Sequence, residues 1–309
     1  MKIVFMGTPE FSLACFERLL AEGHEVLAAF VQPDKPKGRK MHLVAPPVKV
    51  RSIEAGIPVE QPTTLRYNEA LETLREYAPE LIIVVAYGKI LPSEILALPK
   101  YGCVNVHASL LPKYRGAAPY QWAVLNGETE SGVTTMLMAE GIDTGDMLLQ
   151  RRCAIPEDMT AGELHDVLAK LGADTLAETL CLMETGRLVP QPQDSTQATH
   201  APMLGKALSP IDWQKSAAAL HNQVRGLNPW PGAETVLLGR RLKIHRSRVA
   251  MDASSGMPPG TISVDAGHVL VSCGDGALEL LEVQPEGKRA MNAMEYLRGV
   301  HCEDTLRFE

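Results

Sequence analysis

The first half of the chain alternates short apolar runs with segments of helical periodicity, and this alternation restricts the possible folds more than any other feature. Residues 2–6, 25–31 and 81–85 are typical of buried strands, and helical patterns occupy the stretches between them. Strands that alternate with helices indicate a parallel sheet. We therefore predict an α/β fold in which residues 1–188 form a Rossmann-like, parallel-sheet N-terminal domain.

The turn after the first strand reads Gly7-Thr8-Pro9. Thr8 is suited to cap the following helix, with Pro9 at the first helical position. A dinucleotide-binding turn would carry the pattern G-x-G-x-x-G, whereas this turn has one glycine, so dinucleotide binding finds little support.

The second half of the chain has a different pattern. Residues 189–205 are rich in Pro, Gln, Thr and Ser and are interpreted as a linker. A helical pattern at 214–225 precedes short strand patterns separated by glycines, near residues 233–238, 241–249, 260–264, 268–273 and 277–284. Short, regularly spaced strands are typical of a small β-barrel. We predict that residues 206–309 form this second domain.

Composition argues against several classes of protein. The formal net charge of −7 over 309 residues gives no general sign of nucleic-acid binding, although it can hide a local basic patch. The six cysteines show neither metal-ligand spacing nor the density of a disulfide scaffold, so we interpret them as reduced thiols of a cytoplasmic protein. We expect no leader peptide before the first strand, and no apolar run approaches the roughly 18–20 residues that span a bilayer. We expect no metal and no membrane contact.

A polar pair interrupts the strand pattern near residue 105. Val104 and Val106 suit an extended chain, and alternation along the strand places Asn105 and His107 together on the opposite face. A strand buried on both faces should carry apolar side chains on both, and ligands of open α/β sheets bind beyond the carboxyl ends of strands. The pair is therefore a candidate for chemistry, with the alternative that it satisfies backbone groups of a loop.

Asp143 lies in a glycine-punctuated loop, residues 139–146, after a strand pattern at 132–138. Like Asp146, it could be a turn residue. A side-chain amide can donate to an oxyanion, an imidazole can move a proton near neutral pH, and a neighbouring carboxylate can fix the imidazole tautomer and favour imidazolium. No Ser or Cys lies in a G-x-S-x-G context. The set indicates direct acyl-type transfer to a nucleophile without a covalent enzyme intermediate.

Two segments are locally basic. Residues 32–49 contain four prolines and a glycine, which predicts an irregular segment, and carry Lys35, Lys37, Arg39, Lys40 and Lys49 against Asp34. This segment could be a solvated surface or a mobile arm that meets phosphates. A second basic cluster lies between residues 225 and 248. Within it, Trp230 between two prolines is interpreted as a packing anchor rather than a platform for base stacking.

Several ordered motifs resemble the folate-dependent formyltransferases. They are Asn105-Val-His107, the run from Ser109 to Gly116, and Asp143-Thr-Gly-Asp146. The resemblance implies that Asn105, His107 and Asp143 are the catalytic residues. It also implies that tetrahydrofolate binds along two segments, which comprise Ser109, Leu110, Leu111 and Pro112, and Lys89, Ile90 and Leu91.

Further motifs narrow the resemblance to members whose acceptor is methionyl initiator tRNA. These motifs are Met6–Phe11, Gln32–Pro36 and Leu227–Gly232, and the likeness covers nearly the full chain. The resemblance implies that 10-formyltetrahydrofolate is the formyl donor and that the second domain is an OB-like barrel that helps to hold tRNA. We expect a cytoplasmic monomer whose tRNA contacts include Lys35, Lys37, Arg39, Lys40, Arg240, Arg241 and Lys243.

Two other functions remain open on the sequence alone. A related enzyme could carry the same catalytic residues but formylate an amino sugar nucleotide or a purine intermediate, or hydrolyse formyl-folate with water. The basic segment at 32–49 and the barrel argue against this. The protein could also be a binding module that has lost catalysis and only holds tRNA. The intact Asn105, His107 and Asp143 argue against this alternative.

Overall fold

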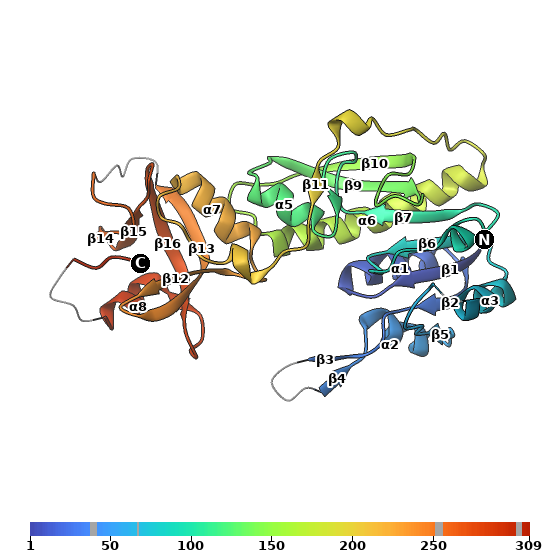
Figure 1. The fold of residues 1–309 in the computed structure, drawn as a ribbon, viewed down its shortest axis with the longest axis horizontal. Helices are drawn as coiled ribbons and strands as arrows, with labels where there is room; N and C mark the ends of the chain where they lie inside the picture. Colours follow the sequence, from blue (N-terminus) through green and yellow to red (C-terminus); the bar gives the residue numbers. More distant parts are fainter. Residues whose placement is uncertain (38–41, 67, 251–255, 301–304) are drawn as a thin grey trace. The chain divides into compact units, whose positions relative to one another are not determined.

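The computed structural model contains two compact units (Figure 1). It describes residues 1–37, 42–66, 68–250, 256–300 and 305–309. The first unit comprises residues 1–116, 131–153 and 165–200, and the second comprises residues 117–130, 154–164 and 201–309. Among the described residues, no helix is both long and apolar enough to cross a membrane.

A seven-stranded sheet forms the centre of the first unit, in the order β10-β9-β7-β6-β1-β2-β5 (Figure 1). The strands are β1 (Lys2–Gly7), β2 (Glu25–Phe30), β5 (Val59–Glu60), β6 (Leu81–Val85), β7 (Cys103–His107), β9 (Glu130–Leu137) and β10 (Met147–Ala154). The strands from β5 to β7 pair in parallel, which confirms the predicted parallel sheet. β9 runs antiparallel to β7, so the sheet reverses direction beside the strand that carries the polar pair.

Helices flank this sheet, and their apolar side chains pack against those of the strands to form the core. They are α1 (Glu10–Ala21), α2 (Pro47–Glu54), α3 (Asn68–Tyr77), α4 (Ser93–Leu96) and α6 (Ala161–Glu184). All five side chains of β6 are buried, as expected for a parallel strand covered on both faces. On one face, Ile82 and Val84 pack with Leu71 and Leu74 of α3. Because β6 is covered on both faces, its sequence is an uninterrupted apolar run.

The predicted helix cap at Thr8 is wrong. Helix α1 begins at Glu10 with Pro9 at the N-cap position and no side-chain cap. The hydroxyl of Thr8 instead accepts a hydrogen bond from the backbone N–H of Gln32 at 3.2 Å, and the Thr8 N–H donates to Ser12 Oγ at 3.2 Å. Thr8 thus ties the first turn to the end of β2 rather than to its own helix.

The expectation of an irregular segment at 32–49 is also wrong in part. Strands β3 (Lys35–Lys37) and β4 (His42–Val44) form an antiparallel hairpin in which Pro36 pairs with Leu43. A two-stranded ribbon has only edge strands, and an edge strand tolerates the missing N–H of a proline. Of the residues predicted to contact tRNA here, Lys35 is exposed, whereas Arg39 and Lys40 lie outside the described residues.

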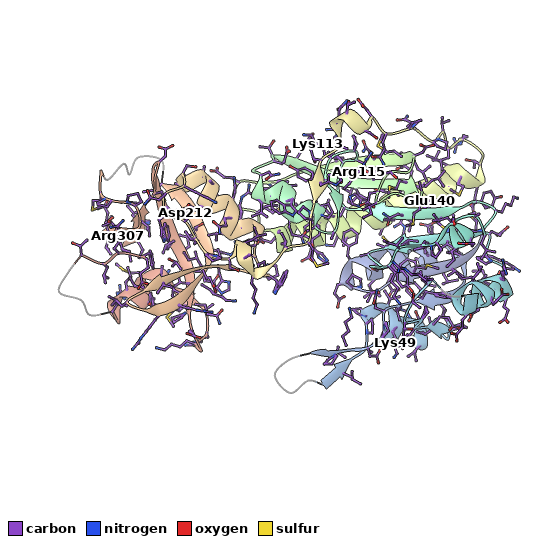
Figure 2. The ribbon with its side chains drawn as sticks, viewed as in Figure 1. Lys49, Lys113, Arg115, Glu140, Asp212 and Arg307 are labelled. Carbon is purple, nitrogen blue, oxygen red and sulfur yellow. The ribbon has the colours of Figure 1, made fainter. Side chains whose placement is uncertain are left out.

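Lys49 of α2, labelled in Figure 2, is held in a polar cluster with Asp34 and Gln61. Its Nζ donates to both carboxylate oxygens of Asp34 and to Gln61 Oε1, each at 2.8 Å. Gln61 Nε2 donates to Asp34 Oδ1 at 2.8 Å and to the Gln32 carbonyl oxygen at 3.0 Å. Asp34 therefore neutralises one charge of the basic segment, and these bonds join the residue before β3 to α2 and to the residue after β5.

Replacement of Asp34 by asparagine should change how the free energy of unfolding depends on pH at acidic pH. Hydrogen bonds from Lys49 and then Gln61 lower the pKa of the Asp34 carboxyl from its ordinary value. Because the folded-state pKa lies below the unfolded-state pKa of about 4, the carboxylate adds stability above that pH, and this stability is lost as the pH falls through the folded-state pKa. Urea unfolding of Asp34→Asn should therefore depend less on pH in that window. Asp265→Asn, at an exposed position of the second unit, is the control, and a pH dependence identical to that of the wild type in Asp34→Asn would contradict the prediction.

The second unit is built on an antiparallel sheet in the order β12-β13-β16-β15-β14, with β17 paired to β16. Its strands are β12 (Ala233–Leu237), β13 (Arg240–Ala250), β14 (Ile262–Asp265), β15 (His268–Ser272), β16 (Ala277–Pro285) and β17 (Met291–Asn292), and its helices include α5 (Pro119–Leu125), α7 (Ala217–Gly226) and α8 (Ala293–Arg298). The five predicted strands are confirmed to within two residues. Helix α8 was not predicted.

The last residues of the chain join the two edge strands of this sheet. Ile262 of β14 donates its N–H to the Leu306 carbonyl oxygen at 2.9 Å, and the Glu309 N–H donates to the Val236 carbonyl oxygen of β12 at 3.0 Å. Between them, the Phe308 ring stacks on Trp213 in the core, with ring centroids 5.1 Å apart. The sheet is thereby closed into a small barrel, the arrangement that removes exposed strand edges.

Candidate active site

Strand β7 presents its two polar side chains at the carboxyl end of the parallel strands. Val104 and Val106 are buried in the core, while Asn105 is half-buried and His107 is 6 % exposed on the other face. Asn105 lies between Val84 of β6 and Met136 of β9 in the sheet register. The alternation read from the sequence therefore places both candidate residues at the crevice end of one strand.

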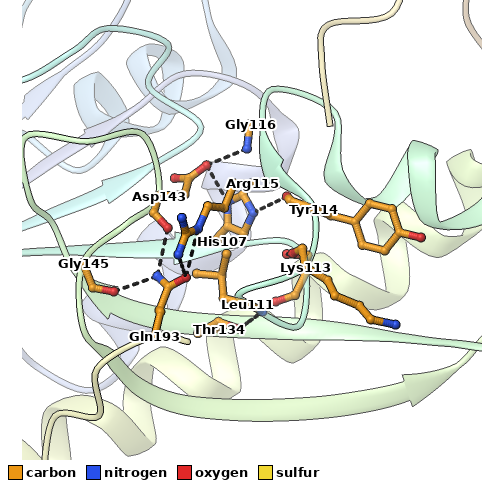
Figure 3. Close-up of polar contacts among 11 residues, drawn as sticks. His107, Leu111, Lys113, Tyr114, Arg115, Gly116, Thr134, Asp143, Gly145 and Gln193 are labelled. Carbon is orange, nitrogen blue, oxygen red and sulfur yellow. Dashed lines mark hydrogen bonds and ion pairs between the residues drawn. The ribbon is translucent and has the colours of Figure 1, made fainter. Parts of the chain in front are cut away.

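His107, the last residue of β7, and Asp143, in the loop after β9, lie close together (Figure 3). The His107 Nδ1 lies 3.6 Å from Asp143 Oδ2, and this same oxygen accepts the Gly116 N–H at 2.8 Å. The His107 Nε2 lies 3.0 Å from the Tyr114 carbonyl oxygen. A carbonyl can only accept, so Nε2 carries a proton and Nδ1 is the nitrogen that faces the carboxylate.

The segment predicted to bind the cosubstrate is held by strands β9 and β10. The Thr134 hydroxyl of β9 donates to the Ser109 carbonyl oxygen at 2.7 Å and accepts the Leu111 N–H at 3.1 Å. Gln150 Nε2 of β10 donates to the Leu111 carbonyl oxygen at 2.7 Å, and Ser109 Oγ donates to the Lys113 carbonyl oxygen at 2.7 Å. These bonds fix the backbone from Ser109 to Lys113 before any ligand binds.

Gln193 is a residue of the site that the sequence reasoning missed. Its Nε2 donates to the carbonyl oxygens of Asp143 and Gly145 at 2.8 and 2.7 Å, and its Oε1 accepts from the Arg115 guanidinium at 2.7 and 3.1 Å (Figure 3). Arg115 is 6 % exposed. Gln193 thus links the loop that carries Asp143 to the loop that follows His107. A single glutamine in a polar segment carries no motif or periodicity that could have revealed this role.

The backbone around Asp143 follows a constrained path. Asp143 has a φ of +52°, a left-handed conformation that aspartate tolerates better than most residues. A Cβ on Gly145 would lie 1.7 Å from the Leu137 carbonyl oxygen, so only glycine fits there. This close approach brings the loop back against β9 and turns the Asp143 carboxylate toward His107.

The three residues after β6 that were predicted to line the folate pocket differ in their surroundings. Lys89 donates to the Pro62 carbonyl oxygen, and burial, with Lys35 nearby, lowers the pKa of its ammonium group. Ile90 is 69 % exposed, whereas the Leu91 side chain belongs to the core and is 3 % exposed. Ile90 therefore offers an apolar surface, and Leu91 can offer only backbone groups.

Asn105 is the one member of the predicted catalytic set with a free side chain: among the described residues, no hydrogen bond to its amide is found. The half-buried amide is therefore available to a ligand. No group of three or more His, Cys, Asp or Glu that could hold a metal ion occurs in the described part of the chain. A cavity of about 380 Å³ lies elsewhere in the unit, beside residues 60–64 and α3, and does not include these three residues.

Two family profiles cover most of the chain. The formyl transferase profile matches residues 1–180, and the profile of the formyl transferase C-terminal domain matches residues 203–301. The chain therefore belongs to the formyl transferase family.

Curated relatives of similar length carry a more specific name. A protein named methionyl-tRNA formyltransferase from Caldanaerobacter subterraneus subsp. tengcongensis is 51 % identical over 300 residues, which is 97 % of each chain. The protein of the same name from Geobacter sulfurreducens is 47 % identical over 307 residues, or 99 % of this chain and 96 % of the relative.

More distant solved structures share the fold. An N-formyltransferase from Helicobacter canadensis, solved with folinic acid and dTDP-3-aminofucose, has a TM-score of 0.70 at 19 % identity and covers 92 % of this chain and 99 % of its own. HypX from Aquifex aeolicus, solved with tetrahydrofolic acid, has a TM-score of 0.66 at 18 % identity and covers 100 % of this chain and 51 % of its own. At these identities the likeness concerns the fold alone.

Proposed function

We propose that this protein transfers the formyl group of 10-formyltetrahydrofolate to the α-amino group of methionyl initiator tRNA. The observation that carries the proposal is the pairing of His107 with Asp143 beside the free amide of Asn105, in a chain about half identical to proteins named methionyl-tRNA formyltransferase. In this proposal residues 1–188 form the catalytic domain, residues 189–205 a linker, and residues 206–309 a domain that assists tRNA binding. The protein acts as a cytoplasmic monomer.

Asn105 acts on the charge that develops during the transfer. When bound, 10-formyltetrahydrofolate supplies the formyl group as an electrophilic carbonyl. The Asn105 amide has no competing hydrogen-bond partner among the described residues, so its N–H can donate to the oxygen that becomes negative when the amine adds. A donor directed at the position where negative charge develops stabilises the transition state.

His107 and Asp143 act on the proton of the amine. A free α-amino group has a pKa of about 8, so a useful fraction of the acceptor is neutral and nucleophilic at neutral pH. The proton released after attack must leave the attacking nitrogen, and the Asp143 carboxylate, 3.6 Å from His107 Nδ1, can accept it directly or through His107. Because Tyr114 occupies Nε2, the exchange uses Nδ1. The bond between the formyl carbon and the folate nitrogen then breaks, and this nitrogen takes up the proton as tetrahydrofolate leaves.

The segment from Ser109 to Pro112 fits a flat heterocyclic cosubstrate. Its backbone is fixed by Thr134 and Gln150, and a fixed backbone offers oriented polar groups without an ordering cost. Lys89, Ile90 and Leu91 follow the neighbouring strand β6 and supply a mixed polar and apolar wall. These residues hold the folate in our proposal, and the chain needs no metal ion for the reaction.

Phosphate contacts of the barrel can be tested through salt dependence. Arg240, Arg241 and Lys243 are exposed on β13. Each cation that contacts a phosphate contributes about one unit to the slope of log affinity against log salt concentration. The double variant Arg241→Ala/Lys243→Ala should therefore lower the slope for tRNA binding by about 2. Lys170→Ala, which removes an exposed cation of α6, is the control, and an unchanged slope in the double variant would contradict these contacts.

The function is tested by formylation of charged tRNAs. The purified protein, supplied with 10-formyltetrahydrofolate, should formylate methionyl initiator tRNA faster than methionyl elongator tRNA, with release of tetrahydrofolate. An amino sugar nucleotide and water, as acceptors, represent the alternative enzymes. Transfer to either of these at a higher kcat/KM, with none to methionyl-tRNA, would overturn the proposal. Tight tRNA binding without any tetrahydrofolate release would indicate a binding module.

A further inference from the structure

Trp230 differs from the other two tryptophans of the chain in its surroundings. The indole N–H of Trp122 donates to the Pro202 carbonyl oxygen at 2.7 Å, and that of Trp213 donates to Thr235 Oγ1 at 3.0 Å in the core. Trp230 is 55 % exposed, and its indole N–H has no acceptor within the described ranges. The interpretation of Trp230 as a packing anchor is therefore wrong, because most of a packing anchor would be buried.

The loop that carries Trp230 is fixed at both ends. Asn228 Nδ2 donates to the His245 carbonyl oxygen at 2.8 Å, and the Asn228 carbonyl oxygen accepts the Gly162 N–H at 3.0 Å. The Gly232 N–H donates to the Leu227 carbonyl oxygen at 2.9 Å, which closes the loop. Hydrogen bonds thus hold the backbone that carries the exposed indole. A ligand that binds the indole therefore loses little free energy in ordering the loop.

Lys243 lies beside this loop, and Arg241 lies two residues away on the same strand, β13. On β13, Leu242 and Ile244 are buried while Arg241 and Lys243 are exposed. A Cβ on Gly232 would lie 3.8 Å from Lys243 Nζ, so the Lys243 ammonium reaches the loop two residues from Trp230. Glu234 lies opposite Lys243 in the strand register, but no ion pair between them is found among the described residues. The cations therefore remain available to an anionic ligand.

We propose that Trp230 is a stacking platform for an unpaired base of the tRNA, with Lys243 and Arg241 on the adjoining phosphates. Proteins that bind single-stranded nucleic acid combine a cationic groove with exposed aromatic rings on which bases stack. An exposed tryptophan can also mark a contact with another protein, but the neighbouring cations favour a polyanion. The inference deepens the proposed function, on which it rests, by naming the tRNA feature that this loop recognises.

The test measures binding of uncharged initiator tRNA to Trp230→Ala and Trp230→Phe, at several salt concentrations. Stacking on one base predicts that Trp230→Ala lowers tRNA affinity about tenfold, with the same salt slope as the wild type because no charge is removed. Trp230→Phe retains a ring and should recover most of this loss. A blunt-ended RNA duplex with the acceptor-stem sequence has no unpaired base, so neither variant should bind it differently from the wild type.

Val264→Ala is the matched control, because Val264 is 53 % exposed in the same unit, and it should bind tRNA as the wild type does. Melting curves and circular dichroism of each variant exclude unfolding as the cause. The proposal is overturned if Trp230→Ala binds tRNA normally, if it loses affinity for tRNA and duplex equally, or if its salt slope changes. Failure of the wild type to formylate methionyl-tRNA would instead overturn the proposed function, so the two failures are distinguishable.

Discussion

Asp143→Asn should lower the rate of formyl transfer by about two to four orders of magnitude while tRNA affinity stays close to that of the wild type. Asparagine keeps the shape of the side chain, and its carbonyl oxygen can still accept the Gly116 N–H that Asp143 Oδ2 accepts at 2.8 Å. The variant loses only the negative charge that faces His107 Nδ1 and the capacity to take a proton. Single-turnover formylation with saturating methionyl-tRNA measures this loss without a contribution from product release.

Asp146→Asn provides the matched control, because Asp146 lies in the same loop and has no role in our mechanism. His107→Ala should lose as much activity as Asp143→Asn. The double variant should lose little more than either single variant, because residues that act as a unit are not additive. Near-normal turnover of Asp143→Asn would refute the assignment of this carboxylate.

Gly145→Ala should destabilise the first unit on the order of 3 kcal/mol, at the upper end of the usual cost of overpacking. The added Cβ would lie 1.7 Å from the Leu137 carbonyl oxygen, and the three nearest atoms all belong to the backbone of Leu137 and Ala139, so no flexible side chain can yield. The loop must then move away from β9 and carry Asp143 with it, so activity should fall together with stability. Urea unfolding followed by circular dichroism measures the loss of stability.

Gly205→Ala is the control for this substitution. Nothing lies within 4 Å of a Cβ at Gly205, and its φ of −146° suits any residue. This variant should unfold at the urea concentration of the wild type. Equal stability of Gly145→Ala and Gly205→Ala would mean that the loop does not follow the path described above.

Strands and helices could be predicted where burial imposes a pattern. The run Leu81–Val85 indicated a covered parallel strand because every side chain of β6 is buried, and the alternation around Asn105 indicated that Asn105 and His107 share one face of β7. The reversal of β9 could not be predicted, because strand direction depends on pairing partners and leaves no trace in local periodicity. Thr8 was misassigned for a similar reason: its hydrogen-bond donor lies on a distant strand.

The candidate site was predicted where it coincides with motifs and missed where it depends on tertiary contacts. Asn105, His107 and Asp143 stand in recognisable patterns, whereas Gln193 does not. The sequence analysis counted Lys49 among the basic residues of its segment and could not show that Asp34 pairs with it. The exposure of the Trp230 side chain could likewise not be predicted, because the flanking prolines indicate a turn but not which way the ring faces.

Gln193 has a consequence for the connection between the two units. The chain passes Gln193 after the sheet of the first unit and before it enters the barrel, and the Gln193 carboxamide holds the backbone of the loop that carries Asp143. In our proposed function, a tRNA that binds the barrel would pull on the segment that contains Gln193, and Gln193 would pass this force to the loop that carries Asp143.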